Sequence, residues 1–268
     1  MANALRIVCS GLFLVAGCGK SAIAPDGPGG GSNGPHDGAP GDVPVHIPGM
    51  PGVGAWGLAD YHLDTSTDQF SLSTPPMSTS ASGSTIVVSI GRGDNRQFVL
   101  PTDNKGNSPY QQLGDVQTYP SYPQSGTAVY AFTGAKGGND FRVSTTRDKN
   151  DAGQMDEITI AAIEIVEGKT IQDFAWIKGT DDPLTSASVT TTGPATLIAF
   201  WWGDGFPHVP QSATPNNDFF RIATNADERD DFVQCAVAAK NVTEPGTYDV
   251  TWAATPTQGA QLWLIAVQ

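Results

Sequence analysis

The nine residues Ile158–Val166 read ITIAAIEIV, and they indicate how the folded part of this chain is built. Apolar side chains occupy both alternating positions of the stretch, so a strand formed here would be buried on both faces. Isoleucine and valine are β-branched and favour extended backbone. The stretch therefore predicts a central β-strand that other parts of the protein cover on both sides.

Further stretches with the same strand-like composition follow one another along the chain, and clusters of Gly, Pro, Asn or Asp separate most of them. No convincing long amphipathic helix interrupts them. From Trp56 to Gln268 the sequence predicts an all-β fold, a single β-sandwich or jelly-roll-like domain. Besides Ile158–Val166, the expected strands are Thr85–Ile90, Ala128–Phe132, Phe141–Thr145, Ile171–Ile177, Thr196–Trp202, Phe232–Ala238, Thr247–Ala253 and Leu262–Val267.

A faint internal repeat accompanies this pattern. Residues 83–94 match residues 193–204 without a gap, and residues 139–143 resemble residues 217–222 with one insertion. The repeat is consistent with a duplicated half-sandwich. The favoured explanation is that buried strands share a composition, because the spacing between the paired blocks differs greatly.

Four short motifs resemble a sandwich module that is common in secreted bacterial proteins. They are the strand Thr85–Val88, the turn Asp103–Asn107, the pair Gly137-Gly138 and the strand segment Ile163–Ile165. The resemblance extends over roughly residues 82–268. Modules of this kind have no single activity, so the resemblance implies a fold and not a function.

The N-terminus has the layout of a secretory signal, with Arg6 before the apolar stretch Ile7–Ala16. The next motif, Val15-Ala16-Gly17-Cys18, resembles a bacterial lipobox. That resemblance implies cleavage before Cys18 and attachment of diacylglycerol and a further acyl chain, such as palmitate, to this cysteine. Several acyl chains anchor a protein stably to a membrane. We therefore expect a cell-envelope lipoprotein whose head is extracytoplasmic, with the choice of inner or outer membrane open.

Three segments follow from this reading: a signal peptide at 1–17, a lipidated Cys18 with a flexible linker to residue 55, and the β domain at 56–268. Residues 24–54 contain ten glycines and seven prolines. Such a stretch cannot bury enough apolar surface to offset the entropy of ordering it. It is expected to act as a tether between the membrane and the head.

Charge and cysteine content limit the classes of function that the sequence allows. Removing residues 1–17 takes away Arg6 and no acidic residue, which leaves 13 basic and 27 acidic side chains and a formal charge of −14. Nucleic-acid binding requires Lys and Arg, so this balance argues against it. Cys9 lies in the signal peptide and Cys18 carries the lipid. Cys235 is then the only free thiol, and we expect it to be a buried core residue.

The segment Trp201-Trp202-Gly203-Asp204-Gly205 is the best candidate for a ligand site. Adjacent residues on a strand face opposite ways, so one indole is expected in the core and the other on the surface. An exposed indole beside Asp204, with His208 close behind, would provide a platform for stacking a sugar. The interpretation in which both indoles belong to the core is nevertheless favoured.

Glu164 is the candidate catalytic residue, because a carboxylate inside an apolar strand must be paired, protonated or functional. A glycosidase would need a second carboxylate across a cleft, and the sequence does not identify one. The structural interpretation, a Glu paired with Arg or Lys, is favoured.

Two acidic loops resemble cation sites weakly. Asp148, Asn150 and Asp151 place oxygen ligands near Gly153, as calcium loops do, but Ala152 and Thr159 occupy positions where ligands belong. Residues 225–231 form the second loop. Calcium is the one cofactor considered, and a solvated loop between strands is the default for both.

These observations favour a non-catalytic β-sandwich head that binds a glycan or another envelope component. Two alternatives stay open: a structural envelope protein that binds no small ligand, and a carbohydrate-active enzyme that uses Glu164.

Overall fold

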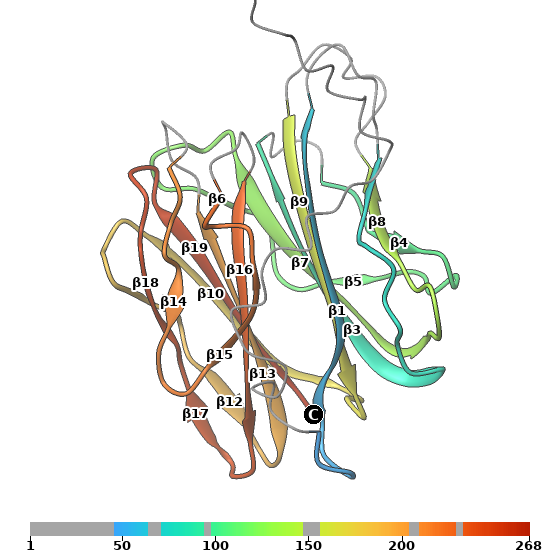
Figure 1. Cartoon of the computed structure of the whole chain (residues 1–268). Helices are drawn as coiled ribbons and strands as arrows, with labels where there is room; N and C mark the ends of the chain where they lie inside the picture. Colours follow the sequence, from blue (N-terminus) through green and yellow to red (C-terminus); the bar gives the residue numbers. More distant parts are fainter. Residues whose placement is uncertain (1–45, 64–70, 94–97, 147–155, 204–208, 229–232) are drawn as a thin grey trace, which may run out of the picture. The chain divides into compact units, whose positions relative to one another are not determined.

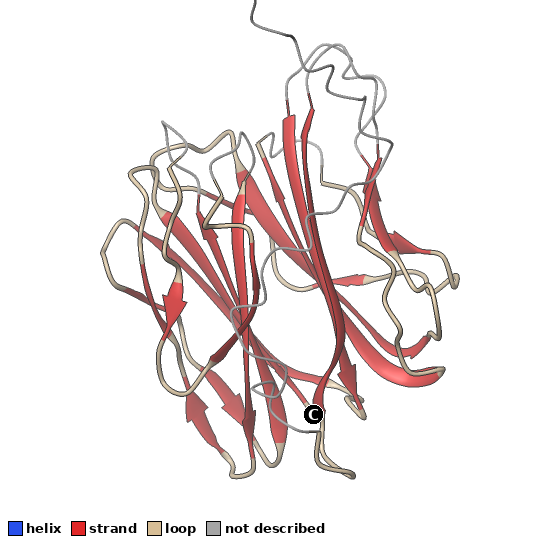
Figure 2. Ribbon diagram, in the orientation of Figure 1, coloured by secondary structure: helices blue, strands red, loops and turns tan. Residues whose placement is uncertain are grey.

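The computed structural model describes residues 46–63, 71–93, 98–146, 156–203, 209–228 and 233–268. These residues form β-strands and loops and contain no helix, which confirms the predicted all-β fold (Figure 2). Two larger antiparallel sheets account for most of the strands, and three small sheets lie beside them (Figure 1). A sandwich-like arrangement results, as the sequence indicates.

The first sheet is built from the N-terminal half of the described chain. Its strand order is β1-β9-β3-β7-β5, and β6 also pairs with β7. Every pair of neighbouring strands in this sheet is antiparallel. The strands are β1 (Gly52–Leu63), β3 (Ser82–Arg92), β5 (Gln111–Gln112), β6 (Gln117–Thr118), β7 (Gly126–Lys136) and β9 (Asp156–Val166).

The second sheet uses the C-terminal half in the order β10-β19-β13-β16-β15. Because β10 lies at the end of this order, one of its edges has no strand of the second sheet beside it. The strands are β10 (Ile171–Gly179), β13 (Ala195–Gly203), β15 (Phe220–Thr224), β16 (Gln234–Val242) and β19 (Ala260–Val267).

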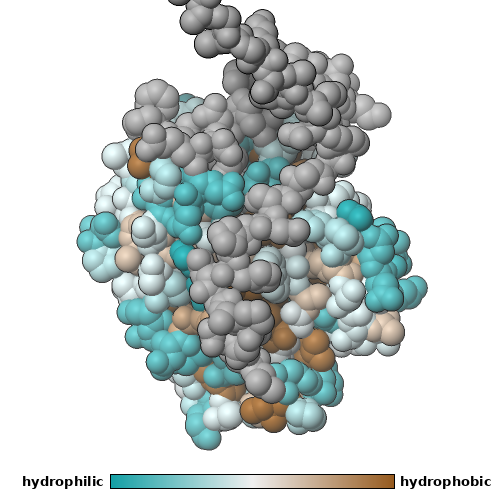
Figure 3. All heavy atoms as spheres, viewed as in Figure 1, coloured by the Kyte–Doolittle hydropathy of each residue, from teal (hydrophilic) through white to brown (hydrophobic). Residues whose placement is uncertain are grey.

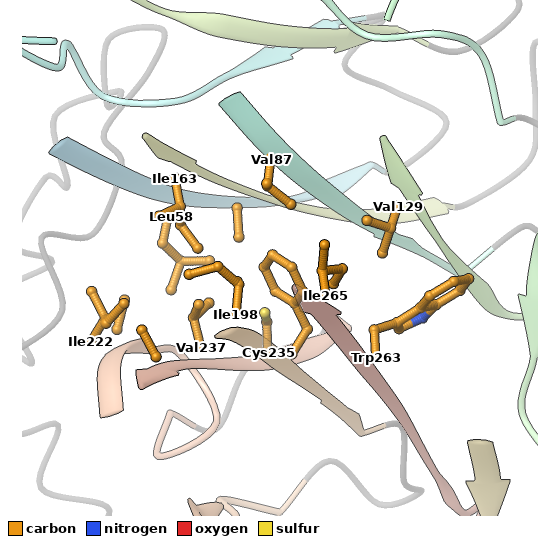
Figure 4. Close-up of a cluster of buried hydrophobic side chains, with 14 of the residues drawn as sticks. Leu58, Val87, Val129, Ile163, Ile198, Ile222, Cys235, Val237, Trp263 and Ile265 are labelled. Carbon is orange, nitrogen blue, oxygen red and sulfur yellow. The ribbon is translucent and has the colours of Figure 1, made fainter. Parts of the chain in front are cut away.

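Side chains from both large sheets meet in a shared apolar core (Figure 4). Leu58, Val87 and Ile163 of the first sheet pack with Ile198 and Trp263 of the second. Burying a side chain of this size contributes about 1.5–3 kcal/mol. This core is the main source of attraction between the two sheets.

Hydrogen bonds across the core fix how the sheets face each other. The Trp202 indole donates to the Ser89 hydroxyl at 2.9 Å, and the Trp263 indole donates to the Thr127 hydroxyl at 2.9 Å. Buried polar groups without partners are costly, so these pairs favour one register of the two sheets over its neighbours.

The outer faces of the large sheets are covered by the small ones. A second apolar cluster lies on the outer side of the second sheet and includes Trp201, Trp252 and Leu264. A third includes Ile90, Tyr130 and Ile160 of the first sheet. The covering strands are β11 (Leu184–Thr185), β14 (Thr214–Pro215) and β18 (Thr251–Ala253), β12 (Val189–Thr191) and β17 (Gly246–Tyr248), and β2 (Ser71–Ser73), β4 (Thr102–Asp103) and β8 (Val143–Thr146).

The expected strands agree with the structure in most places. Ile158–Val166 lies in β9, between β1 and β3, and its residues are buried almost throughout. The expected strand Thr247–Ala253 is two short strands, β17 and β18, which pair with different partners. Strand β1 was not predicted. It begins at Gly52, four residues before the expected start of the domain.

The two halves repeat one topology. In each half the first strand lies beside the last, followed by the two middle strands: β1-β9-β3-β7 and β10-β19-β13-β16. The gapless sequence match, however, aligns Val87 with Leu197. Val87 faces the shared core and Leu197 faces outward. Since a shift of one residue exchanges the faces of a strand, the gapless register is not the structural equivalence between β3 and β13.

Candidate functional site

Trp201 and Trp202 are both fully buried, on opposite faces of β13. The Trp201 indole donates to the carbonyl of Ala254 at 2.9 Å, and the Trp202 indole bonds Ser89. The prediction of one exposed indole is therefore wrong. The second sheet is covered on both sides, so the alternative in which both indoles are core residues holds.

Several other candidates lie outside the described residues. These are Cys18, Asp148, Asn150, Asp151, Asp204 and His208. Within the described ranges, no group of three or more His, Cys, Asp or Glu side chains is arranged to hold a metal ion. A calcium site in residues 148–153 stays a prediction.

Glu164 is buried, with 2 % of its surface exposed, and hydrogen-bond donors of the protein engage both carboxylate oxygens. Oε2 accepts from the Ala55 amide at 3.1 Å. Oε1 accepts from the Ser80 amide at 2.7 Å and from the Ser84 hydroxyl at 2.6 Å. The prediction that Glu164 is structural fits this arrangement, but the donors are amides and a hydroxyl instead of Arg or Lys.

The sequence around Glu164 explains its position. The pairing of β1 with β9 is irregular between Val53 and Trp56, which leaves Gly54 and Ala55 as a bulge opposite Glu164. A bulge removes ladder hydrogen bonds, and the carboxylate supplies an acceptor for the Ala55 amide. A Cβ at position 54 would overlap the carboxylate, so glycine is required there. Glu164 ties β1 and β3 to β9 and offers no free oxygen to a substrate.

Cys235 is fully buried in the shared core, and burial raises the pKa of its thiol well above the ordinary value. The thiolate is the nucleophilic form of cysteine, so a buried and protonated thiol is unreactive. The expectation of a buried core cysteine is confirmed.

The Asp103–Asn107 segment is a structural turn. The Asp103 carboxylate accepts from the amides of Lys105 at 2.8 Å and Asn107 at 3.1 Å, and Gly106 adopts a φ of 77°. The Tyr110 hydroxyl donates to the same carboxylate at 2.8 Å. In the second acidic loop, Asp227 pairs with Arg221 at 3.5 Å. These acidic groups are used within the protein.

The most distinctive surface feature is a row of side chains on the edge strand β10. Phe174, Trp176 and Lys178 point to the same side of the strand, and we call them the β10 strip. Phe174 is 36 % exposed and Trp176 is 39 % exposed. The intervening residues Ala175 and Ile177 pack against the outer apolar cluster of the second sheet. Two large aromatic rings are thus left partly open to solvent, side by side on one strand.

Neighbouring groups hold these rings in place. Gly114, with a φ of 72°, lies so close that an added Cβ would be 3.3 Å from the Phe174 ring and 3.9 Å from the Trp176 indole. On the other side, Trp176 packs on the buried Trp263 with ring centroids 6.3 Å apart and planes tilted by 44°. The Lys178 ammonium donates to the Thr118 hydroxyl at 3.4 Å.

The sequence pattern alone does not single out Trp176 as a ligand-binding residue. The alternation in Phe174–Lys178 does show that the aromatic pair shares one face. Whether that face is open depends on β10 being an edge strand, which is a property of the sheet order. Figure 3 shows a largely hydrophilic surface on this face, with most of the visible hydrophobic residues in its lower half.

Comparison with known proteins identifies no relative: no family model, no curated protein and no solved structure matches this chain. The described residues also contain no helix long and apolar enough to cross a membrane.

Proposed function

We propose that this protein is a lipid-anchored lipoprotein of the bacterial cell envelope whose extracytoplasmic β-sandwich head binds glycan without catalysing a reaction. The observation that carries the proposal is the pair of exposed aromatic rings, Phe174 and Trp176, on the edge strand β10. Aromatic side chains offer large flat apolar surfaces, which suit the apolar faces of sugar rings.

The proposal that the head does not catalyse a reaction rests on the structural roles of Glu164 and Cys235. Glu164 has both oxygens bonded by protein donors, and Cys235 is fully buried. A glycosidase needs two carboxyl groups that face one substrate. Glycan binding through an exposed aromatic surface would use neither Glu164 nor Cys235, so both residues can keep their structural roles.

The anchor and the compartment rest on the sequence. The lipobox-like motif at Cys18 and the Gly/Pro-rich tether after it suit a head that stands away from a membrane. Cys235 is free in the structure, so the described fold does without a disulfide. The acidic balance of the chain, with 27 acidic and 14 basic residues, disfavours nucleic acid and polyanionic ligands.

The test is a glycan array probed with the full-length lipoprotein in detergent. We expect retention on a small set of neutral glycans and no binding to single- or double-stranded DNA. Failure to retain any glycan, together with recovery of envelope proteins by crosslinking in cells, would support the structural-protein alternative and reject glycan binding.

A further inference from the structure

We propose that the β10 strip is the glycan site and that its ligand is an unbranched, neutral glycan chain that lies along the strand. Phe174 and Trp176 would each stack on a sugar ring, and Lys178 would donate hydrogen bonds to hydroxyl groups. This inference rests on the proposed glycan-binding function and assigns it to named residues.

The spacing of the two rings suits a chain better than a single sugar. Phe174 and Trp176 are two residues apart on one strand, which separates their backbone positions by about 7 Å. Both side chains project to the same side, as the exposure pattern of β10 shows. A linear ligand parallel to β10 can therefore contact both rings with successive parts of its chain.

The rings are held in position before a ligand arrives. Gly114 lies close to both rings, and Trp263 packs against Trp176, so neighbouring groups restrict the two side chains. Trp263 is itself fixed by its bond to Thr127. Less side-chain entropy is lost on binding when rings are already ordered, so weak stacking contacts give more net affinity.

Polar groups flank the aromatic pair, as recognition of a sugar requires. Lys178 continues the row beyond Trp176, and its ammonium lies next to the Thr118 hydroxyl. The exposed Gln112 amide bonds the Gly114 carbonyl beside the Phe174 ring. Sugar hydroxyls both donate and accept hydrogen bonds, and these side chains supply both kinds of partner.

The main alternative ligand is a peptide that would add a strand to the free edge of β10. Part of that edge is already covered by other residues of the protein. The Asp173 carboxylate accepts from the Thr190 amide at 2.8 Å, and the Gln172 side chain accepts from the Thr192 amide at 3.2 Å. These contacts bring the β12 region against the first half of β10. A charged residue such as Lys178 on an edge strand also discourages pairing. The two aromatic side chains are thus partly exposed, while the backbone edge is partly covered.

The experiment measures dissociation constants by calorimetry for cellohexaose and for the hexasaccharide of N-acetylglucosamine, with polygalacturonate as an anionic comparison. Full-length wild type is compared with Phe174→Ala, Trp176→Ala and the double variant. Loss of one stacking ring is expected to weaken binding of the retained hexasaccharide by about tenfold or more. The double variant should show no measurable binding, and polygalacturonate should bind no variant.

Leu100→Ala is the matched control, because Leu100 is 49 % exposed and lies just before β4, outside the second sheet. It should bind as wild type does. Trp176→Phe keeps a ring and should retain part of the affinity, which separates loss of stacking from misfolding of Trp176→Ala.

The results of these binding measurements can be told apart from the results of the glycan array. Wild-type binding that Phe174→Ala and Trp176→Ala leave unchanged would overturn the β10 assignment while leaving glycan binding in place. Preference for polygalacturonate, or dimerisation of the wild type that either alanine variant abolishes, would also overturn it. An array that retains nothing rejects the proposed function itself.

Discussion

Replacing Glu164 by alanine is expected to lower the free energy of unfolding by about 3–5 kcal/mol. The substitution removes the acceptor of three donors, the Ala55 amide, the Ser80 amide and the Ser84 hydroxyl. Buried donors left without partners pay their full desolvation cost. Urea denaturation followed by circular dichroism measures the change.

Glu164→Gln separates charge from hydrogen bonding, since it keeps one acceptor oxygen and should lose less stability than alanine. Glu244→Ala is the control, because Glu244 lies exposed in the loop between β16 and β17 and its side chain should contribute within about 0.5 kcal/mol. A Glu164→Ala protein as stable as the Glu244→Ala protein would contradict the structural role of the carboxylate.

The second large effect concerns the membrane anchor. Cys18→Ser is expected to change the protein from a processed, membrane-bound form to a soluble or unprocessed one. Each buried methylene of an acyl chain contributes about 0.8 kcal/mol, so losing the chains removes nearly all the attachment. Cell fractionation locates the protein, and intact-mass analysis shows whether residues 1–17 are absent and whether lipid is present.

Cys9→Ser provides the comparison for this variant, because Cys9 also lies in the N-terminal segment but not at the expected cleavage site. It should be processed and lipidated like the wild type. A Cys18→Ser protein that stays membrane-bound and loses residues 1–17 as efficiently as the wild type would remove the lipoprotein proposal.

The sequence predicts the strands that are continuous apolar runs. Residues 158–166 and 196–202 have enough β-branched and aromatic side chains to identify β9 and β13 without structural information. Strand β1 is harder to recognise, since Gly52, Gly54 and Gly57 weaken its intrinsic preference for extended structure. Its pairing with β9 along most of its length compensates, and pairing between distant segments is not visible in local composition.

The candidate site also depends on contacts between distant segments, which local sequence composition does not reveal. Trp201 and Trp176 are both tryptophans on strands, but one is fully buried and the other is 39 % exposed. Trp201 is covered because small strands from elsewhere in the chain pack on the outer face of β13. Trp176 is open because β10 ends the sheet. Exposure therefore depended on sheet order and covering layers, which alternation along a single strand does not specify.

Oxidative labelling of tryptophan in the full-length protein, with and without bound hexasaccharide and read by mass spectrometry, tests the central claim most directly. Trp176 should label readily in the free protein and become protected when the glycan binds, whereas Trp201 and Trp202 should stay unlabelled in both states. Binding that leaves Trp176 as reactive as before, or that protects residues away from β10, would contradict the account.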